Sequence, residues 1–331
     1  MKKKLILLNE IGLNEIFTEA FRDEGYDVIS ILEQPFLYKK NIWTKLMNIY
    51  NRVILKNNNF YGDDYYKKLN NEVYRRLKKI NTEVDYALVF RSDYYSNKNI
   101  RLLREKSKML VSYQYDGWEL GNTIVKHKDY LDRVFFFEKD DLSKYGEKAL
   151  PLTNCFFYSN EANPSVEFDI FYVGTGTRNR IKNLKNIYNR LGKKYKIKGL
   201  ITIPEYQKED KWGEMQFSHK GVSYKENITL LRTSKCLIDI KFSYHNGLSF
   251  RFFEALYYKK KLITNNESVK KYDFYNSSNI FITDFENLEG IEEFLDKPYI
   301  EIDDNIVEKY GFKNWSRYVL DQPSYQEITL P

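Results

Sequence analysis

Short apolar runs alternate with amphipathic helical stretches along this chain, and that alternation constrains the fold more than any other feature. The runs at residues 4–8, 84–90 and 108–113 are nearly continuous in apolar side chains, and a helical pattern over residues 13–24 follows the first of them. Strands that are apolar on both faces are typical of parallel sheets covered by helices on each side. We therefore expect an α/β protein.

The same alternation starts again in the second half of the chain. Residues 168–173 read as the first strand of a new series, a helix begins at about Arg178, and further strands are expected at 195–203, 236–242, 261–264 and 279–282. A chain of 331 residues is also longer than one hydrophobic core usually organises. We expect two Rossmann-like lobes with a cleft between them.

The restart predicts the domain boundaries. Residues 1–160 would form the first lobe, and residues 161–302 the second. Residues 303–331 would add a C-terminal helix, read over 303–320, and a tail that crosses back to the first lobe.

Composition limits the class of protein. Hydrophobic residues make up 42% of the chain and aromatic residues 17%, which is enough for two cores and excludes disorder. No apolar run approaches the roughly 18 residues of a membrane span, and the apolar start is too short for a signal peptide. Cys155 and Cys236 lie in strand-like apolar runs, which favours buried, reduced thiols. We expect a cytoplasmic protein.

Residues 38–79 form a basic insertion rich in aromatic residues. The segment contains eleven Lys or Arg residues and three acidic residues, Asp63, Asp64 and Glu72. The net charge of the whole chain is +7. Three interpretations stay open: a pair of solvated helices, a surface for anionic lipid or a phosphate-bearing acceptor, and a single-stranded RNA site. The sign of the charge alone does not choose among them.

The most informative segment comprises residues 246–256 and directly follows the strand expected at 236–242. Gly247 permits a tight strand-to-helix turn, after which Leu248 and Ser249 open a helix. The N-terminus of a helix offers free N–H groups and a partial positive charge to a phosphate, and the hydroxyl of Ser249 adds a donor.

Two charged residues follow inside that helix. Arg251 presents a planar guanidinium that suits a diphosphate whose charge grows as a glycosidic bond breaks. Glu254 lies three residues further, near the same helix face, where a carboxylate can accept both hydroxyls of a ribose. The alternative is an ion pair between Arg251 and Glu254 on the helix surface.

Residues 247–256, Gly-Leu-Ser-Phe-Arg-Phe-Phe-Glu-Ala-Leu, resemble the nucleotide-sugar site of GT-B glycosyltransferases. The resemblance is to bacterial capsule and lipopolysaccharide enzymes with a Gly-Leu-(Ser/Thr)-x-Arg-x-x-Glu-Ala-Leu segment, and it includes Phe-Phe-Phe-Glu-Lys-Asp-Asp at 135–141. It implies a GT-B architecture, a nucleotide-sugar donor and Glu254 as the ribose-binding glutamate. Asn246 stands where many retaining members have a second glutamate, so retention or inversion stays open.

A glycine-rich loop opens the second lobe. Residues 171–180, Phe-Tyr-Val-Gly-Thr-Gly-Thr-Arg-Asn-Arg, read as a strand, a loop and the start of a helix, although Asn179 replaces the third glycine of a G-x-G-x-x-G pattern. In the resembling fold this loop faces the donor diphosphate, which makes Gly174, Thr175 and Arg178 candidates for phosphate contact. A plain turn with a solvated arginine is the alternative.

A capping pattern occurs at residues 220–227, where Ser223 reads as a helix N-cap with Glu226 as its partner. Capping alone explains the pattern. In the resembling enzymes the corresponding turn lies beside the nucleobase, which makes Ser223 and Tyr224 secondary candidates for donor binding.

In the first lobe, candidate acceptor residues follow two of the expected strands. Asp116 comes just after the strand at 108–113, where ligands of open sheets gather, and could act as a general base on an acceptor hydroxyl. Trp118 could stack on a sugar ring. A turn-forming Asp-Gly pair is the alternative. Arg91 and Asp93 are weaker candidates for acceptor contact, and the loop at residues 10–12 is weaker still.

Other chemistries fit the sequence poorly. His127, His219 and His245 are the only histidines, and none has a carboxylate or cysteine at ligand spacing. No Asp-x-Asp pair stands between strands, and no Walker loop, Gly-x-Ser-x-Gly or His-Glu-x-x-His motif is present. We expect no metal and no cofactor beyond the donor itself. His245 borders the Gly247 turn as a donor contact or as a solvated loop residue.

The sequence thus predicts a metal-independent transferase of bacterial surface polysaccharide synthesis. Its partners would be a nucleotide-sugar donor, a glycan or lipid-linked glycan acceptor and the anionic inner face of the membrane, without nucleic acid. Arg251, Ser249 and the 174–178 loop would take the diphosphate, while Asp116 acts on the acceptor. The rivals are a nucleotide-sugar epimerase on the same fold, a nucleic-acid binder and a catalytically silent nucleotide-binding protein.

Overall fold

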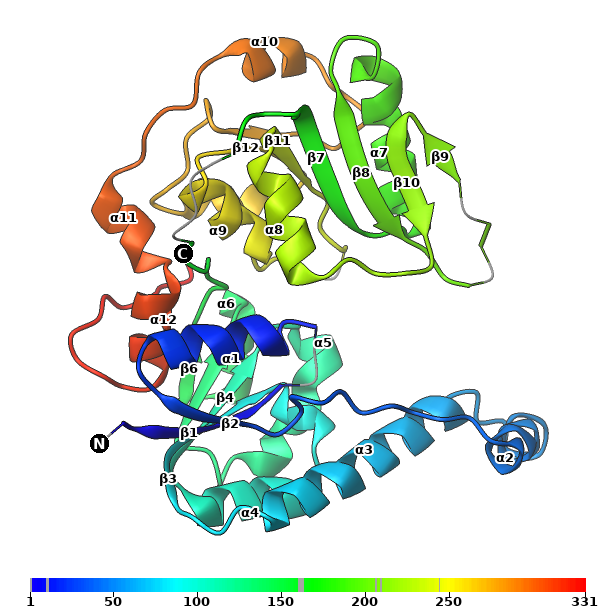
Figure 1. The fold of residues 1–331 in the computed structure, drawn as a ribbon, viewed down its shortest axis with the longest axis vertical. Coiled ribbons are helices and arrows are strands. Elements are labelled where there is room, and N and C mark those ends of the chain that lie inside the picture. The colour runs from blue at the N-terminus through cyan, green and yellow to red at the C-terminus, as the bar shows by residue number, and fades with distance from the viewer. Residues whose placement is uncertain (1, 10–11, 160–163, 206, 209, 244) are drawn as a thin grey trace. The chain divides into compact units, whose positions relative to one another are not determined.

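The computed structural model describes residues 2–9, 12–159, 164–205, 207–208, 210–243 and 245–331. The chain divides into two compact units. Unit 1 comprises Met1–Phe136 and Asp140–Leu150, and unit 2 comprises Phe137–Lys139 and Pro151–Pro331. Each unit has its own parallel sheet with helices packed on it, which confirms the predicted α/β class with two Rossmann-like lobes (Figure 1).

Unit 1 contains a six-stranded sheet in the order β2-β1-β3-β4-β5-β6, and the pairs from β2 to β5 are parallel. The strands are β1 (Lys4–Leu8), β2 (Asp27–Ser30), β3 (Val84–Phe90), β4 (Ser107–Gln114), β5 (Arg133–Phe136) and β6 (Ala149–Pro151). Four residues of β1 and five consecutive residues of β3 are buried. That pattern arises because helices cover both faces of the sheet.

The helices of unit 1 connect these strands. They are α1 (Asn14–Asp23), α2 (Ile42–Val53), α3 (Phe60–Lys78), α4 (Asn97–Lys106), α5 (Trp118–Gly121) and α6 (Lys139–Tyr145), with the 3-10 helices η1 (Ser92–Tyr94) and η2 (Asn122–His127). Leu69, Val73 and Leu77 of α3 face the core at a helical spacing. The chain passes from β1 to β2 on one side and returns at β3 on the other, so the switch point lies between the carboxyl ends of β1 and β3.

Unit 2 contains a seven-stranded sheet in the order β13-β12-β11-β7-β8-β10-β9. Its strands are β7 (Phe168–Thr175), β8 (Ile197–Thr202), β9 (Lys211–Trp212), β10 (Glu214–Ser218), β11 (Ser234–Asp239), β12 (Lys261–Thr264) and β13 (Ile280–Ile282). All pairs are parallel except β9 with β10. β9 and β10 are not among the predicted strands, although Met215 and Phe217 of β10 alternate with more exposed residues as a strand requires.

The helices of unit 2 are α7 (Arg178–Leu191), α8 (Tyr224–Arg232), α9 (Phe250–Tyr257), α10 (Ile291–Asp296), α11 (Asp304–Lys309) and α12 (Phe312–Val319), with the 3-10 helix η3 (Glu267–Lys271). The first strand, β7, has β8 on one side and β11 on the other. The switch point of unit 2 therefore lies between the carboxyl ends of β7 and β11, and the second series predicted from the sequence begins at this point in the topology.

The terminal helix predicted over residues 303–320 is interrupted. It forms α11 and α12, which Tyr310 and Gly311 separate. The interruption arises because the backbone around Gly311 forms a bridge with Phe156, where the N–H of Phe312 donates to the Phe156 carbonyl at 2.9 Å. Both short helices belong to unit 2, and the predicted crossing to the first lobe stays a prediction.

No helix within the described ranges is long and apolar enough to cross a bilayer. Cys155 and Cys236 are both fully buried and form no disulfide, as the apolar runs around them predict.

Candidate functional site

Arg251 lies at the switch point of unit 2. Its Nη2 donates to the Val173 carbonyl at 2.8 Å and its Nη1 to the Ile238 carbonyl at 3.3 Å. Val173 lies near the carboxyl end of β7 and Ile238 near that of β11, so the guanidinium joins the carboxyl ends of the two strands. The helix that carries it, α9, begins in the segment where the sequence predicts a helix start.

A second arginine, Arg180, reaches the same end of the sheet. Its Nε donates to the Ile240 carbonyl at 2.9 Å, and its guanidinium lies 3.7 Å from the centre of the Phe242 ring. The arginine predicted from the sequence, Arg178, is exposed. Residues two positions apart on a helix point in nearly opposite directions. Only one of Arg178 and Arg180 can therefore face the sheet.

The apolar spacing of α7 could have identified Arg180. The buried residues of this helix are Leu184, Ile187 and Leu191, which lie four, seven and eleven positions after Arg180. That spacing places Arg180 on the buried stripe of the helix. Arg178 falls outside the stripe.

A buried tyrosine lies beside Arg251, whose guanidinium is 5.8 Å from the centre of the Tyr172 ring. Tyr172 is 1% exposed, and its hydroxyl has no hydrogen-bond partner among the described residues. Burial raises the pKa of Tyr172, while the charges of Arg180 and Arg251 oppose that shift. A Cβ on Gly174 would come within 2.9 Å of the hydroxyl, so glycine keeps the space beside it open. Buried polar groups without partners are rare and mark places where a ligand or water completes the bonding.

The N-terminus of α9 is held by a carboxylate. Ser249 takes the N-cap position but makes no capping bond with its side chain. Instead its Oγ donates to Asp239 Oδ1 at 2.6 Å, and Asp239 Oδ2 accepts from Thr264 Oγ1 at 3.1 Å. The first N–H groups of α9 therefore lack a side-chain cap, and Leu248 beside them is buried.

Gly247 is required for packing. A Cβ there would lie 2.1 Å from a ring carbon of Phe137, which belongs to unit 2. The Asn266 amide donates to the Gly247 carbonyl at 3.1 Å. His245 is not a solvated loop residue, because its Nδ1 lies 3.3 Å from Glu138 Oε1 and its side chain is only 14% exposed.

Glu254 is covered in this structure. The residue is 2% exposed and the hydroxyl of Tyr224 is hydrogen-bonded to its carboxyl. Burial raises the pKa of Glu254, while Arg251 and Tyr224 act in the opposite direction. Glu254 therefore does not form an ion pair on the helix surface. A ribose would reach its carboxyl only after a side chain has moved. Ser223 caps α8 by accepting from the Glu226 N–H at 3.2 Å.

The remaining candidates of the glycine-rich loop are at the surface. Thr175 and Arg178 are exposed, and Thr177 caps α7 by accepting from the Arg180 N–H at 3.4 Å. Their phosphate contacts stay a prediction.

In unit 1, Arg91 and Asp93 form a buried pair at the carboxyl end of β3. Arg91 donates from Nε and Nη2 to the two carboxylate oxygens of Asp93 at 2.9 and 2.8 Å, and its Nη1 contacts Asp116. Burial opposes the charge of Arg91, but the bonds and charge of Asp93 outweigh it and raise the pKa of the guanidinium. Both side chains are more than nine-tenths buried, so the predicted acceptor contact is not available to either in this conformation.

Asp116 remains accessible. Its side chain is 25% exposed, and its pairing with Arg91 fixes it beyond the end of β4. Trp118 begins α5, is partly buried against the core of unit 1 and lies 6.3 Å from the Phe136 ring. The proposed stacking of Trp118 on a sugar stays a prediction. Of the loop at residues 10–12, residues 10 and 11 lie outside the described residues.

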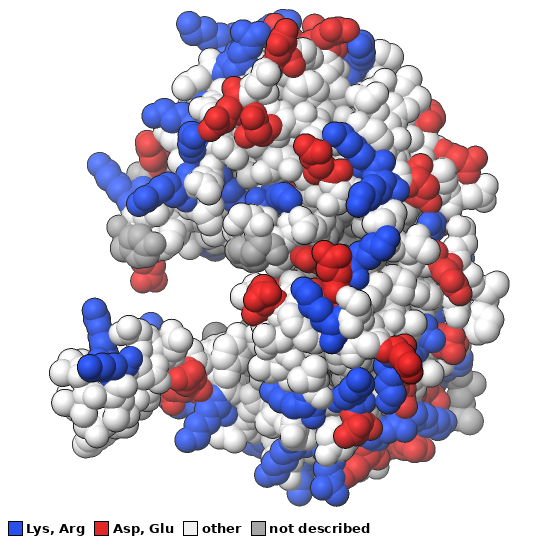
Figure 2. Space-filling view, turned by 180° about the vertical axis from the view of Figure 1, so that it is seen from behind, with Lys and Arg blue, Asp and Glu red and all other residues white. Residues whose placement is uncertain are grey.

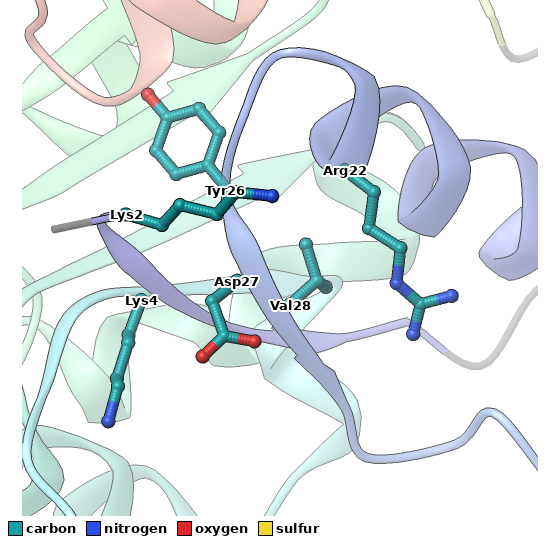
Figure 3. A pocket seen from close by; sticks show the side chains of 6 residues that line it. All are labelled: Lys2, Lys4, Arg22, Tyr26, Asp27 and Val28. Carbon is teal, nitrogen blue, oxygen red and sulfur yellow. The ribbon is translucent and has the colours of Figure 1, made fainter.

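Two of the surface hollows among the described residues lie at strand ends. One, at the amino end of β2, is lined by Lys2, Lys4, Arg22, Tyr26, Asp27 and Val28 (Figure 3). It faces away from the strand ends where open α/β sheets bind ligands. The other lies at the carboxyl ends of β12 and β13 in unit 2, and Asn265, Thr283 and Asp284 are part of its lining. No group of three His, Cys, Asp or Glu side chains in the described ranges is arranged to hold a metal ion.

Two Rossmann-like units in one chain define the GT-B class of architecture. Comparison with solved structures shows the same fold. An α,α-trehalose-phosphate synthase from Burkholderia xenovorans is 10% identical with a TM-score of 0.58, over 97% of this chain and 100% of that one. The N-terminal domain of trehalose-6-phosphate phosphatase from Candida albicans is 11% identical with a TM-score of 0.56, over 98% and 97%.

A sucrose-phosphate synthase from Thermosynechococcus elongatus is 9% identical with a TM-score of 0.50, over 97% of this chain and 93% of that one. No protein-family model matches the sequence. No curated protein matches it either. At these identities the similarity establishes the fold, and the chemistry has to be argued from the site.

Proposed function

We propose that this chain is a glycosyltransferase that moves a sugar from a nucleotide donor to a glycan or lipid-linked glycan in bacterial surface polysaccharide synthesis. One observation carries the proposal. Arg180 and Arg251 both reach the carboxyl ends of β7 and β11, where the buried Tyr172 hydroxyl has no partner among the described residues. A topological switch point with two guanidinium groups and a hydroxyl suits a phosphate-bearing ligand.

The two guanidinium groups and the N-terminus of α9 would bind the diphosphate. Charge accumulates on the diphosphate as the glycosidic bond breaks, and fixed cations and N–H groups stabilise that charge without reorganisation. The carbonyls of Val173 and Ile238 hold Arg251 in one orientation. Because the protein supplies this positive charge itself, the proposed reaction needs no metal ion.

The proposal assigns the other candidates as follows. Glu254 binds the ribose after the Tyr224 hydroxyl has left its carboxyl. Asp116, held by Arg91 and partly exposed, removes the proton of the acceptor hydroxyl. Trp118 contacts the acceptor sugar.

Nucleotide binding tests the donor site. We expect one of UDP, GDP, CMP and dTDP to stabilise the parent protein in thermal unfolding, with EDTA present. Arg180→Ala and Arg251→Ala should each weaken that binding by about tenfold or more, because each removes a charge-assisted hydrogen bond. Arg251→Lys guards against a folding defect, since it keeps the charge but loses the planar fork.

Two arginines of α7 serve as matched controls. Arg190 lies near the end of the same helix and its side chain is 55% exposed, so Arg190→Ala should bind the nucleotide like the parent. Arg178→Ala compares the arginine predicted from the sequence, Arg178, with the one that the structure places at the sheet edge, Arg180. The variant that loses nucleotide binding identifies the arginine that contacts the ligand. Equal affinity of the Arg180, Arg251 and Arg190 variants would contradict the proposed site. Release of nucleoside diphosphate only with acceptor present would distinguish a transferase from an epimerase.

A further inference from the structure

Residues 37–56 of unit 1 form an arm that gathers most of the exposed apolar side chains. The arm consists of α2 with its flanking segments, and α3 connects it to the sheet of unit 1 (Figure 1). Fifteen large apolar side chains are exposed among the described residues, and ten of them belong to this arm. Monomeric soluble proteins rarely concentrate apolar surface in this way, so the arm is built for a partner.

The helix α2 presents its apolar face outward. Its exposed apolar residues recur at helical spacing, and they are Ile42, Trp43, Leu46, Met47, Ile49, Tyr50 and Val53. Its buried residues are Thr44 and Asn51, which are both polar. Asn41 accepts from the Thr44 N–H at 2.9 Å, and Asn51 donates to the Met47 carbonyl at 2.8 Å. An ordinary surface helix shows the opposite arrangement, so water is not the natural environment of this face.

The positive charge of the arm indicates an anionic partner. Lys39, Lys40, Lys45, Arg52 and Lys56 lie between residues 34 and 62, and no Asp or Glu occurs in that stretch. On the helix, Lys45 and Arg52 lie beside the apolar stripe, roughly 40–60° from its edge at Ile49. Figure 2 shows the arm as a largely uncharged surface that carries Lys and Arg side chains.

We propose that this arm docks on an anionic lipid bilayer, with the apolar face of α2 in the headgroup boundary and Lys45 and Arg52 at the level of the lipid phosphates. Trp and Tyr are the side chains that suit this boundary, and Trp43 and Tyr50 are 72% and 50% exposed. A second copy of the chain fits poorly, because two arms with five cations each would repel. Single-stranded RNA also fits poorly, because the stripe is mostly aliphatic and offers few rings for stacking.

Flotation of the full-length protein with vesicles tests the proposal. We expect the protein to float with vesicles of phosphatidylcholine and phosphatidylglycerol. Its affinity for vesicles of pure phosphatidylcholine should be lower by about tenfold or more. The double variant Trp43→Ser/Ile49→Ser should lose about tenfold or more of the binding through the apolar face. Lys45→Glu/Arg52→Glu should lose the preference for anionic vesicles, and high salt should reproduce that loss in the parent.

Val166→Ser/Ile300→Ser is the matched control, because it removes two exposed apolar side chains outside the arm, which are 51% and 44% exposed. It should float like the parent. All these positions are on the surface, so unchanged thermal unfolding will show that each variant is folded. The proposal is overturned if the Trp43→Ser/Ile49→Ser variant floats like the parent. It is equally overturned if the parent does not float and sediments as a dimer that this variant dissociates. Neither result depends on nucleotide binding, so the docking surface and the proposed activity are tested separately.

Discussion

Ser249 donates a hydrogen bond from its Oγ to Oδ1 of Asp239 at 2.6 Å, and this bond ties the start of α9 to the carboxyl end of β11. Asp239 is 4% exposed, so its carboxylate depends on protein donors in place of water. A serine whose hydroxyl the sequence offers to a phosphate thus donates to a buried carboxylate, and no side chain caps the helix N-terminus.

Removing the Ser249 hydroxyl should destabilise unit 2. We expect Ser249→Ala to lower the free energy of unfolding by about 1–3 kcal/mol, because a buried carboxylate loses one of its donors. Denaturant unfolding measures the change. Ser243→Ala, at an exposed position of the same loop, should have almost no effect. Equal stability of the two variants would show that the bond contributes little.

A side chain at Gly247 should disturb the turn before α9. We expect Gly247→Ala to destabilise the protein by roughly 1–3 kcal/mol, because its Cβ would lie 2.1 Å from the rigid Phe137 ring. The double variant Gly247→Ala/Phe137→Leu should recover part of that loss, since it removes the clashing ring. Thermal unfolding of the four proteins of this cycle gives the coupling. Purely additive effects would refute the clash.

The stability contribution of Glu254 should depend on pH. Burial raises its pKa in the folded protein above its ordinary value of 4.5. The folded state therefore keeps this proton to a higher pH than the unfolded state, so stability is full below pH 4.5 and falls as the pH rises through the folded pKa. Glu254→Gln cannot ionise, and we expect its melting temperature to gain on the parent as the pH rises from 4.5 to 8.

The exposed Glu226 of α8 provides the comparison for that experiment. Glu226→Gln should melt with the same pH dependence as the parent. If the difference between Glu254→Gln and the parent is the same at pH 4.5 and at pH 8, the carboxyl of Glu254 is not perturbed as we describe.

His127 should destabilise unit 1 in mild acid. Its side chain is fully buried and its Nε2 lies 3.0 Å from the Tyr95 carbonyl. Burial, with a smaller effect from Lys126, lowers the pKa of His127 from 6.5 to about 4. The unfolded chain therefore takes up a proton below pH 6.5 that the folded protein refuses until about pH 4. Stability is full above that window and is lost across it, by at most roughly 3 kcal/mol at about 1.4 kcal/mol per pKa unit.

Unfolding measured across that window checks the effect of His127. His127→Gln should lose less stability than the parent between pH 6.5 and pH 4, whatever its stability at neutral pH. His219→Gln, at an exposed histidine, should follow the parent. Parallel curves for the parent and the His127 variant would contradict the prediction.

The local pattern of the sequence predicts most of the layout of the elements, although it misses β9 and β10. The apolar run of β11, the helix after Gly247 and the restart at β7 were all predicted, because strand and helix periods depend on neighbours in the chain. The interruption between α11 and α12 was not predicted, because it depends on pairing with Phe156, more than 150 residues away.

The sequence alone therefore predicts the α/β class, the order of most strands and helices and the strands that end at the two switch points. Which side chains meet across the fold depends on tertiary contacts, such as Tyr224 on Glu254 and Asp116 on Arg91. Parallel strands are joined by crossovers, so residues adjacent at a sheet edge come from distant parts of the chain. Their burial and charge depend on contacts that no local period records.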